Sequence, residues 1–290
     1  MPDVICNVCG RASALAGCEQ ATVRSNVRAF RDERFAVWRC PHCRSIHARD
    51  EVDLSHYYAR YPRFAQSTEE RLAPAYRNFL RRLTRAGLAP GATVLDYGCA
   101  TGSFVRFLRA NGHPDTQGYD AYTEAFARRA VLDVRYDCVV SQDVIEHVPS
   151  PNELLASFER LAVPGGLVTI GTPDADAIDL TRPQDYVHVL HAPYHRHIVS
   201  RKALCESAQA RGWSLVRFHS TMYSNTPLPG QNPRFGLHYL RCYDDCLDLF
   251  AEPVRLDSWR LFAPDGLFWL FCGYFFDRHT DVMFTFRTPA

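Results

Sequence analysis

Two aspartates lie before and after a glycine-containing segment in the middle of the chain. Asp96, Gly98 and Gly102 form an Asp-x-Gly-x-x-x-Gly pattern, and 22 residues after Gly98 comes Asp120. A glycine turn lets a ligand approach bare backbone, and an acidic residue at that distance can accept both ribose hydroxyls. The spacing is not Gly-x-Gly-x-x-Gly, which disfavours a bound pyrophosphate. The two carboxylates instead favour a nucleoside that carries a positive charge.

A second group of residues has the composition for acid–base chemistry. Asp143, Glu146 and His147 are spaced i, i+3, i+4, so on a helix they would share a face. Further on, residues 186–197 (YVHVLHAPYHRH) carry His188, His191, His195 and His197. Histidine titrates near neutral pH, so we expect His191 or His195 to act as a general base with His147 in support. Two histidines with Glu146 would instead bind a divalent metal, and purely structural roles are the third interpretation.

Four cysteines near the N-terminus have the spacing of a structural zinc site. They form two Cys-x-x-Cys pairs, Cys6 with Cys9 and Cys40 with Cys43. Zinc prefers four thiolates in a tetrahedron, and a full set of protein ligands leaves no position for a substrate. We therefore expect a zinc ribbon with a structural role. Possible substitute ligands are Cys18, His42 and His47, and a redox-active pair is the alternative.

Alternating strands and helices are expected to position the aspartates and histidines. From Ala92 onward we expect strands at 93–96, 118–120, 138–141, 167–170 and 213–218, and helices at 103–110, 122–130, 152–161 and 201–212. This alternation is typical of a parallel α/β sheet, in which the carboxyl ends of the strands meet at one edge. An amphipathic helix is expected at 67–88, and 282–286 alternates as a last strand would.

Composition and charge limit the class of protein. The chain has 290 residues, of which 47% are hydrophobic and 22% charged, which is ordinary for a folded globular protein. A net charge of +1 argues against a dedicated nucleic-acid-binding protein. We find no apolar run of about 18 residues and no signal peptide, so we expect a cytoplasmic protein that does not enter a membrane. In that compartment the 11 cysteines indicate metal binding or free thiols.

These motifs, taken in order, resemble the class I S-adenosylmethionine (SAM)-dependent methyltransferases, which have a Rossmann-like doubly wound sheet. VLDYGCATGSF resembles their first motif, GYD the second acidic element, SQDVIEHVPSP the loop and helix after strand four, and LAVPGGLVTIGTP the segment through strand five. The resemblance covers about residues 65–220. The ribbon resembles an N-terminal extension of many bacterial members. The expected domains are 1–50 (ribbon), 51–90 (connector and helix), 91–220 (SAM binding) and 221–290 (substrate-side insertion and terminal strands).

The resemblance implies a role for each residue of the cofactor site. Asp96, Gly98 and Gly102 would hold the methionine part, Asp120 the ribose, Tyr119 and Ala121 the adenine, and Ser141 and Gln142 the sulfonium side. Ala100 departs from the family, because many members have a second glycine there. Only 16 residues separate Asp120 from Asp137, where the family usually has a third strand and an acidic adenine contact. Asp133 is the candidate substitute for that contact.

The expected function is methyl transfer from SAM to a small-molecule acceptor, at oxygen, with a histidine base. Residues 235–286 are rich in aromatic side chains, which would line a partly apolar acceptor pocket, form a homodimer contact or pack in the core. The ribbon and the 15 arginines among residues 1–90 also fit an RNA or tRNA methyltransferase. A sugar or polyketide C-methyltransferase is a further alternative, and so is a non-catalytic scaffold with the same fold, which Ala100 and the short third-strand region would fit.

Overall fold

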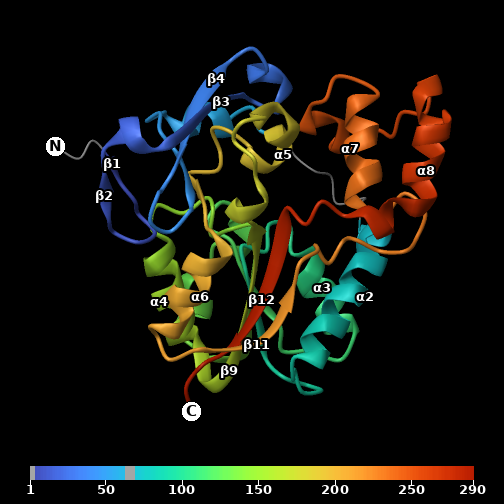
Figure 1. Cartoon of the computed structure of the whole chain (residues 1–290). Coiled ribbons are helices and arrows are strands. Elements are labelled where there is room, and N and C mark those ends of the chain that lie inside the picture. Colours follow the sequence, from blue (N-terminus) through green and yellow to red (C-terminus); the bar gives the residue numbers. More distant parts are fainter. Residues whose placement is uncertain (1–3, 63–68) are drawn as a thin grey trace.

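A mixed α/β sheet forms the body of the protein, as the computed structural model shows for residues 4–62 and 69–290 (Figure 1). The strands of this sheet are β6 (Val94–Tyr97), β7 (Gln117–Tyr119), β8 (Tyr136–Gln142), β9 (Ala162–Pro173), β11 (Ser214–His219) and β12 (Asp281–Arg287). Their order is β11-β12-β9-β8-β6-β7. Strands β6 to β9 pair in parallel, and β12 is antiparallel to both of its neighbours. The predicted doubly wound sheet is therefore confirmed.

Helices cover both faces of this sheet. One layer contains α2 (Glu69–Arg85) and α3 (Ser103–Ala110), and the other contains α4 (Pro151–Leu161) and α6 (Arg201–Gln209) (Figure 1). Successive residues of a strand face opposite sides, so Val94 packs under α2 and α3 while Leu95 packs under α4 and α6. Central strands covered on both faces are apolar throughout, which explains the run of buried residues in β8.

The segment between β7 and β8 differs from the prediction of a helix at 122–130. It contains two short 3₁₀ turns, Glu124–Phe126 and Arg129–Leu132, and no strand. The carboxylate of Asp120 accepts hydrogen bonds from the backbone N–H groups of Tyr122 and Thr123, which closes a turn at the expected start of the helix. β7 is consequently the edge strand of the sheet.

The N-terminal part forms a second, smaller sheet that incorporates a distant strand. Its strands are β3 (Glu19–Arg24), β4 (Arg34–Arg39), β5 (Ile46–Ala48) and β10 (His197–Ile198), in the order β10-β5-β4-β3, and β1 (Val4–Ile5) pairs separately with β2 (Ala12–Ser13). A short helix, α1 (Leu54–Tyr58), follows β5. Arg39 donates hydrogen bonds to the carbonyls of Ala175 and Ile178, just beyond β9. The small sheet therefore lies at the carboxyl edge of the large one.

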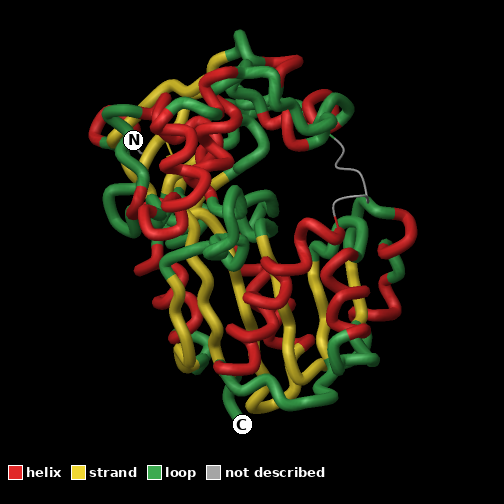
Figure 2. The backbone as a smooth tube through the Cα atoms, turned by 90° about the vertical axis from the view of Figure 1, so that its right-hand side faces the viewer, coloured by secondary structure: helices red, strands yellow, loops and turns green. Residues whose placement is uncertain are grey.

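A long insertion between β11 and β12 lies beside the small sheet. It contains α7 (Pro233–Arg241) and α8 (Pro264–Cys272), and α5 (Val187–Leu190) lies nearby in the segment after β9. Arg24 of β3 and Asp245 of the insertion form an ion pair at 2.5 Å. Figure 2 shows the strands of the large sheet below and the small sheet with the insertion above. Within the described ranges, every helix lacks the combined length and apolar character that a bilayer crossing requires.

Candidate active site

Asp96 and Asp120 meet at the carboxyl edge of the large sheet. β6 and β7 are paired, so the two aspartates at their ends are brought together. Asp120 accepts a hydrogen bond of 3.1 Å from the backbone N–H of Ala100, which ties the glycine turn to the end of β7. Asp96 is only 6% exposed, and no described residue donates a hydrogen bond to its carboxylate.

The electrostatics of this pair favour a cationic ligand. Burial raises the pKa of Asp96 to about 7, and the charge of Asp120 adds to the effect. A buried carboxylate with no hydrogen-bond donor is costly, and a positively charged group placed beside it would favour its ionised form. The two aspartates that the sequence singled out thus form one anionic site next to bare backbone.

Two positions of the turn, Gly98 and Gly102, require glycine both for close packing and for their backbone conformation. Gly98 and Gly102 have φ of +86° and +75°, in the left-handed region that favours glycine. A Cβ on Gly98 would lie 2.2 Å from a methyl carbon of Val144, and one on Gly102 would lie 2.1 Å from the ring of Phe126. Gly102 thus allows Phe126 to pack against the turn, while Gly98 allows the loops after β6 and β8 to approach each other.

The other residues that the resemblance assigns to the cofactor differ in their burial and in their contacts. Tyr119 is buried and its ring packs 5.1 Å from that of Tyr97, whereas Ala121 is exposed. Ser141 is buried, and its hydroxyl has no hydrogen-bond partner among the described residues. The side chain of Gln142 lies over Gly171, where a Cβ would be 1.9 Å from its oxygen. Gly171 therefore supports the end of β8, a role that the sequence alone did not indicate.

Glu146, His147 and His195 form a compact group beside this edge. One ligand atom from each lies within 4.8 Å of the others. The Nδ1 atom of His147 is 3.1 Å from the carbonyl oxygen of Tyr194, and that of His195 is 2.9 Å from the carbonyl oxygen of Val189. A carbonyl only accepts hydrogen bonds, so in both rings Nδ1 carries the proton and Nε2 presents a lone pair.

Glu146 contributes a third lone pair to this group. Its side chain is completely buried; one oxygen accepts a hydrogen bond from Thr172, and the other has no partner in the described chain. The unpaired oxygen is 3.9 Å from Nε2 of His195. Desolvation lowers the pKa of His147 to about 4 and also lowers that of His195, so both rings are neutral at pH 7. The group can accept a proton or hold a divalent cation.

The other histidines of the 186–197 segment have structural partners. Both nitrogens of His191 are engaged, Nδ1 with Asn26 at 2.7 Å and Nε2 with Tyr61 at 3.3 Å. His188 pairs with Asp245, and His197 lies 2.7 Å from the carbonyl oxygen of Ile145. On a helix Asp143, Glu146 and His147 would share a face, but residues 143–147 form a bend and a turn. As a result, Asp143 is not part of the group formed by Glu146 and His147.

Two tyrosines that the sequence analysis did not select complete the site. The hydroxyl of Tyr58, on α1, lies 3.2 Å from Nδ1 of His147, and its ring stacks on that of Tyr122, just beyond Asp120. Tyr223 follows β11 and packs 4.6 Å from the ring of Phe79. Both come from segments remote in sequence from the aspartates. The signal for Tyr58 is the aromatic composition of the connector (HYYARYPRF), which does not contain Tyr223.

The four cysteines of the predicted ribbon converge. Cys6, Cys9, Cys40 and Cys43 place their sulfurs within 4.8 Å of one another, with Sγ–Sγ distances of 3.5 Å between Cys6 and Cys43 and 3.8 Å between Cys9 and Cys40. Zinc–sulfur bonds of about 2.3 Å in a tetrahedron require sulfurs about 3.8 Å apart. This donor set therefore fits a structural zinc ion. Nε2 of His47 lies 3.2 Å from the Cys6 sulfur, where it can donate a hydrogen bond.

The fold and the acidic turn together define a class I SAM-dependent methyltransferase architecture. Residues 66–217 match the methyltransferase domain family, and the chain belongs to this family. The buried carboxylate of Asp96, which accepts no hydrogen bond from the described residues, suits a positively charged group of SAM, the cofactor that the family implies.

Individual proteins show more distant similarity. The chain is 28% identical over 134 residues to an uncharacterized 37.1 kDa protein in transposon Tn4556 of Streptomyces fradiae, which is 39% of this chain and 38% of that protein. The chain thus spans well under half the length of this relative. It is similar to a putative sarcosine dimethylglycine methyltransferase from Galdieria sulphuraria (16% identity, 79% and 92% of the two chains, TM-score 0.44). It is also similar to a SAM-dependent methyltransferase from Mesorhizobium loti (15%, 73% and 97%, TM-score 0.44).

Proposed function

We propose that the protein transfers the methyl group of SAM to an oxygen atom of a small-molecule acceptor, with His147 or His195 as the general base. The observation that carries this proposal is the pair of buried Nε2 lone pairs beside Glu146, near the edge where Asp96 lies. A neutral imidazole in this tautomer is the form that can remove a proton from a hydroxyl group.

The acidic turn would bind and orient the cofactor, which supplies an electrophilic methyl group when bound. Asp96 would accept hydrogen bonds from the ammonium group of SAM, and the free lone pairs of Asp120 would accept those of the ribose hydroxyls. Asp120 already receives the N–H groups of Ala100, Tyr122 and Thr123, so its carboxylate is held in position before any ligand arrives. Such preorganisation reduces the entropic cost of binding.

The histidines would act on the acceptor. As the acceptor oxygen forms its bond to the methyl carbon, its proton would pass to Nε2 of His147, and S-adenosylhomocysteine would leave. The hydrogen bond from the Nδ1–H group of His147 to the Tyr194 carbonyl keeps the ring in the tautomer whose lone pair is on Nε2. The carboxylate of Glu146 would stabilise the resulting imidazolium, which then releases its proton to solvent.

A divalent cation is a second candidate ligand of the same three side chains. Burial and the charge of Asp143 raise the pKa of Glu146 well above its usual range, so the carboxyl group favours its protonated form. A cation bound between Glu146, His147 and His195 would favour the ionised carboxylate and accept the lone pairs of both imidazoles. Two imidazoles and a carboxylate are common ligands of divalent transition metals. In this case the acceptor hydroxyl would be ionised next to the ion, and methyl transfer to oxygen would remain the outcome.

The proposal predicts that Asp96→Asn weakens SAM binding about ten- to hundredfold, because a hydrogen bond to a charged group contributes about 1.5–3 kcal/mol. Isothermal titration of SAM and S-adenosylhomocysteine measures the effect. Asp115→Asn is the matched control, because Asp115 is an exposed aspartate between α3 and β7. If wild type binds neither compound, the proposed function is wrong.

SAM affinity is also expected to increase with pH. Cation binding requires ionised Asp96, whose pKa is about 7, so the affinity should rise about tenfold from pH 6 to pH 8. The neighbouring Tyr76 and Tyr223 have raised pKa values and stay neutral in this range. Desolvation between the surrounding loops raises the pKa of Asp143 to about 7, so it titrates in the same interval. An unchanged pH profile in Asp96→Asn would assign the effect to Asp143 instead.

A further inference from the structure

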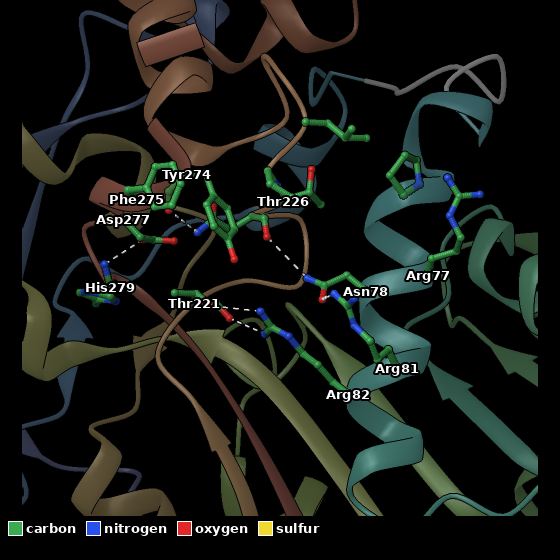
Figure 3. A pocket seen from close by; sticks show the side chains of 14 residues that line it. Arg77, Asn78, Arg81, Arg82, Thr221, Thr226, Tyr274, Phe275, Asp277 and His279 are labelled. Atoms are coloured by element: carbon green, nitrogen blue, oxygen red, sulfur yellow. Dashed lines mark hydrogen bonds between the residues drawn. The ribbon is translucent and has the colours of Figure 1, made fainter. Parts of the chain in front are cut away.

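A cavity of about 500 Å³ lies between α2 and the segment that follows β11 (Figure 3). Arg77, Asn78, Arg81 and Arg82 line it from α2, and their spacing places them on one face of the helix. The other face of α2, which includes Phe79, is buried against the large sheet. The cavity-facing side of this helix is therefore strongly cationic.

Arg82 makes this wall a fixed structure. It is only 8% exposed, and its guanidinium donates hydrogen bonds to the carbonyl and hydroxyl oxygens of Thr221 and to the carbonyl of Met222. Figure 3 shows Arg82 extending from α2 toward Thr221 across the base of the cavity. These contacts hold the segment after β11 against α2, so the cavity is defined in the absence of a ligand.

Arg77 and Arg81 of this wall have no ion-pair partner among the residues that the structure describes. Arg81 donates one hydrogen bond, to Asn78, and Arg77 has neither a hydrogen bond nor an ion pair within the described ranges. Among the described residues, three arginines and a single acidic residue, Asp277, line the cavity. Guanidinium groups with free N–H donors bind phosphate and carboxylate groups well, because their planar fork matches two oxygens of the anion.

The opposite wall offers hydrogen-bond acceptors. Asn225 is 5% exposed and donates a hydrogen bond of 3.2 Å to the carbonyl of Tyr274, but its side-chain oxygen has no partner in the part of the chain described. One oxygen of Asp277 accepts the N–H of His279 at 2.9 Å, while the other is also buried without a described partner. Unpaired buried acceptors call for a donor, such as a hydroxyl group of a ligand.

The segment that forms this cavity also packs toward the glycine turn of the cofactor site. Tyr223 lies between Thr221 and Asn225, and its ring stacks 4.6 Å from that of Phe79. Phe79 in turn stacks 4.7 Å from Phe104 of α3, the helix that begins directly after the glycine turn. One part of the segment therefore lines the cavity, while Tyr223 packs toward the helix that follows the glycine turn. The cavity thus lies on the side of the glycine turn that α2 and α3 cover.

We propose that this cavity binds the methyl acceptor through a phosphate or carboxylate group, on a molecule that also carries hydroxyl groups. This inference rests on the proposed function. The anionic group faces Arg77 and Arg81, and hydroxyl groups donate to Asn225 and Asp277. The volume lies in the usual range for small-molecule sites, about 300–1,000 Å³, which favours a small acceptor over RNA.

Calorimetric titration with four probes tests the proposal, using wild-type protein with and without S-adenosylhomocysteine. Glycerol 3-phosphate carries both kinds of group, inorganic phosphate only the anion, and glycerol only the hydroxyls, while malonate replaces the phosphate by carboxylates. We expect glycerol 3-phosphate or malonate to bind at least tenfold more tightly than glycerol, and their ranking identifies the anion. In the double variant Arg77→Ala/Arg81→Ala this affinity should fall tenfold or more, with unchanged affinity for S-adenosylhomocysteine.

Arg160→Ala is the matched control, because Arg160 is an exposed arginine of α4 on the other helix layer, bonded to Ser157. Equal affinity of the double variant and wild type for both anions would overturn the proposal, as would the absence of anion binding. Binding of an RNA oligonucleotide that competes with glycerol 3-phosphate would also overturn it in favour of RNA. Failure of S-adenosylhomocysteine to bind wild type would refute the proposed methyl transfer separately.

Discussion

Replacing Cys40 with serine should remove the zinc ion and lower the melting temperature by about 10 °C or more. Cys40 and Cys6 are both fully buried and belong to the same hydrophobic cluster as Leu95 of β6 and Phe158 of α4. Loss of one thiolate leaves three sulfur ligands, of which those of Cys6 and Cys43 are buried, and an incomplete site. Disorder in the ribbon would therefore expose part of the main core, and a loss of several kcal/mol corresponds to a shift of this size in a chain of this length.

The measurement combines metal analysis by mass spectrometry with a thermal unfolding scan. Cys18→Ser is the matched control, because the Cys18 sulfur is outside the cysteine cluster and donates a hydrogen bond to the carbonyl of Ala14. Wild type and Cys18→Ser should contain one zinc ion per chain, and Cys40→Ser none. If Cys40→Ser melts at the wild-type temperature, the cluster has no role in stability and the ribbon assignment fails.

The parts of the site that could be predicted from sequence are those fixed by local pattern. The alternation of strands and helices places the ends of β6 and β7 at one edge, so the meeting of Asp96 and Asp120 follows from two short motifs. The cysteine pairs are equally local, since each pair forms its own turn. Their spacing in sequence is enough to predict the chemistry of the ligands.

The histidines could not be distinguished in the same way. His191 and His195 are four residues apart in one segment, and by sequence both are candidates for the base. Asn26, 165 residues away, engages Nδ1 of His191, whereas His195 is held by the nearby carbonyl of Val189 and keeps Nε2 free. Which ring nitrogen is available depends on partners that the sequence pattern does not identify.

The cavity beside α2 was hidden for a related reason. From sequence, Arg77 and Arg81 belong to an arginine-rich stretch that is ordinarily a solvated helix face. The structure covers this face with residues 221–228 and 274–279, which lie more than 130 positions further along the chain. An insertion with weak periodicity gives no signal for such packing, so the function of the arginines depends on tertiary structure alone.

Replacing His147 with alanine should slow methyl transfer about a hundredfold or more while SAM affinity stays within twofold of wild type. General bases contribute about 10²–10⁴ in rate, and His147 forms hydrogen bonds with Tyr58 and Tyr194, not with the aspartates proposed to bind the cofactor. The wild-type protein is first incubated with labelled SAM and a small-molecule extract, and the compound that becomes labelled is the acceptor. The rate of methyl transfer to this acceptor is then measured for the variant. His42→Ala, at an exposed histidine of the ribbon, should retain full activity.

The pH dependence of His147→Ala distinguishes between two roles of His147, a general base and a metal ligand. Without a base, the acceptor hydroxyl must ionise in solution, so the rate of His147→Ala should rise about tenfold per pH unit below the acceptor pKa. If the three side chains bind a divalent cation, a weak chelator that spares the ribbon zinc should inactivate wild type, and excess Mg²⁺ or Mn²⁺ should restore its activity. Wild-type rates for both His147→Ala and His195→Ala would show that neither ring takes the proton, and the buried lone pairs beside Glu146 would then need a purely structural explanation.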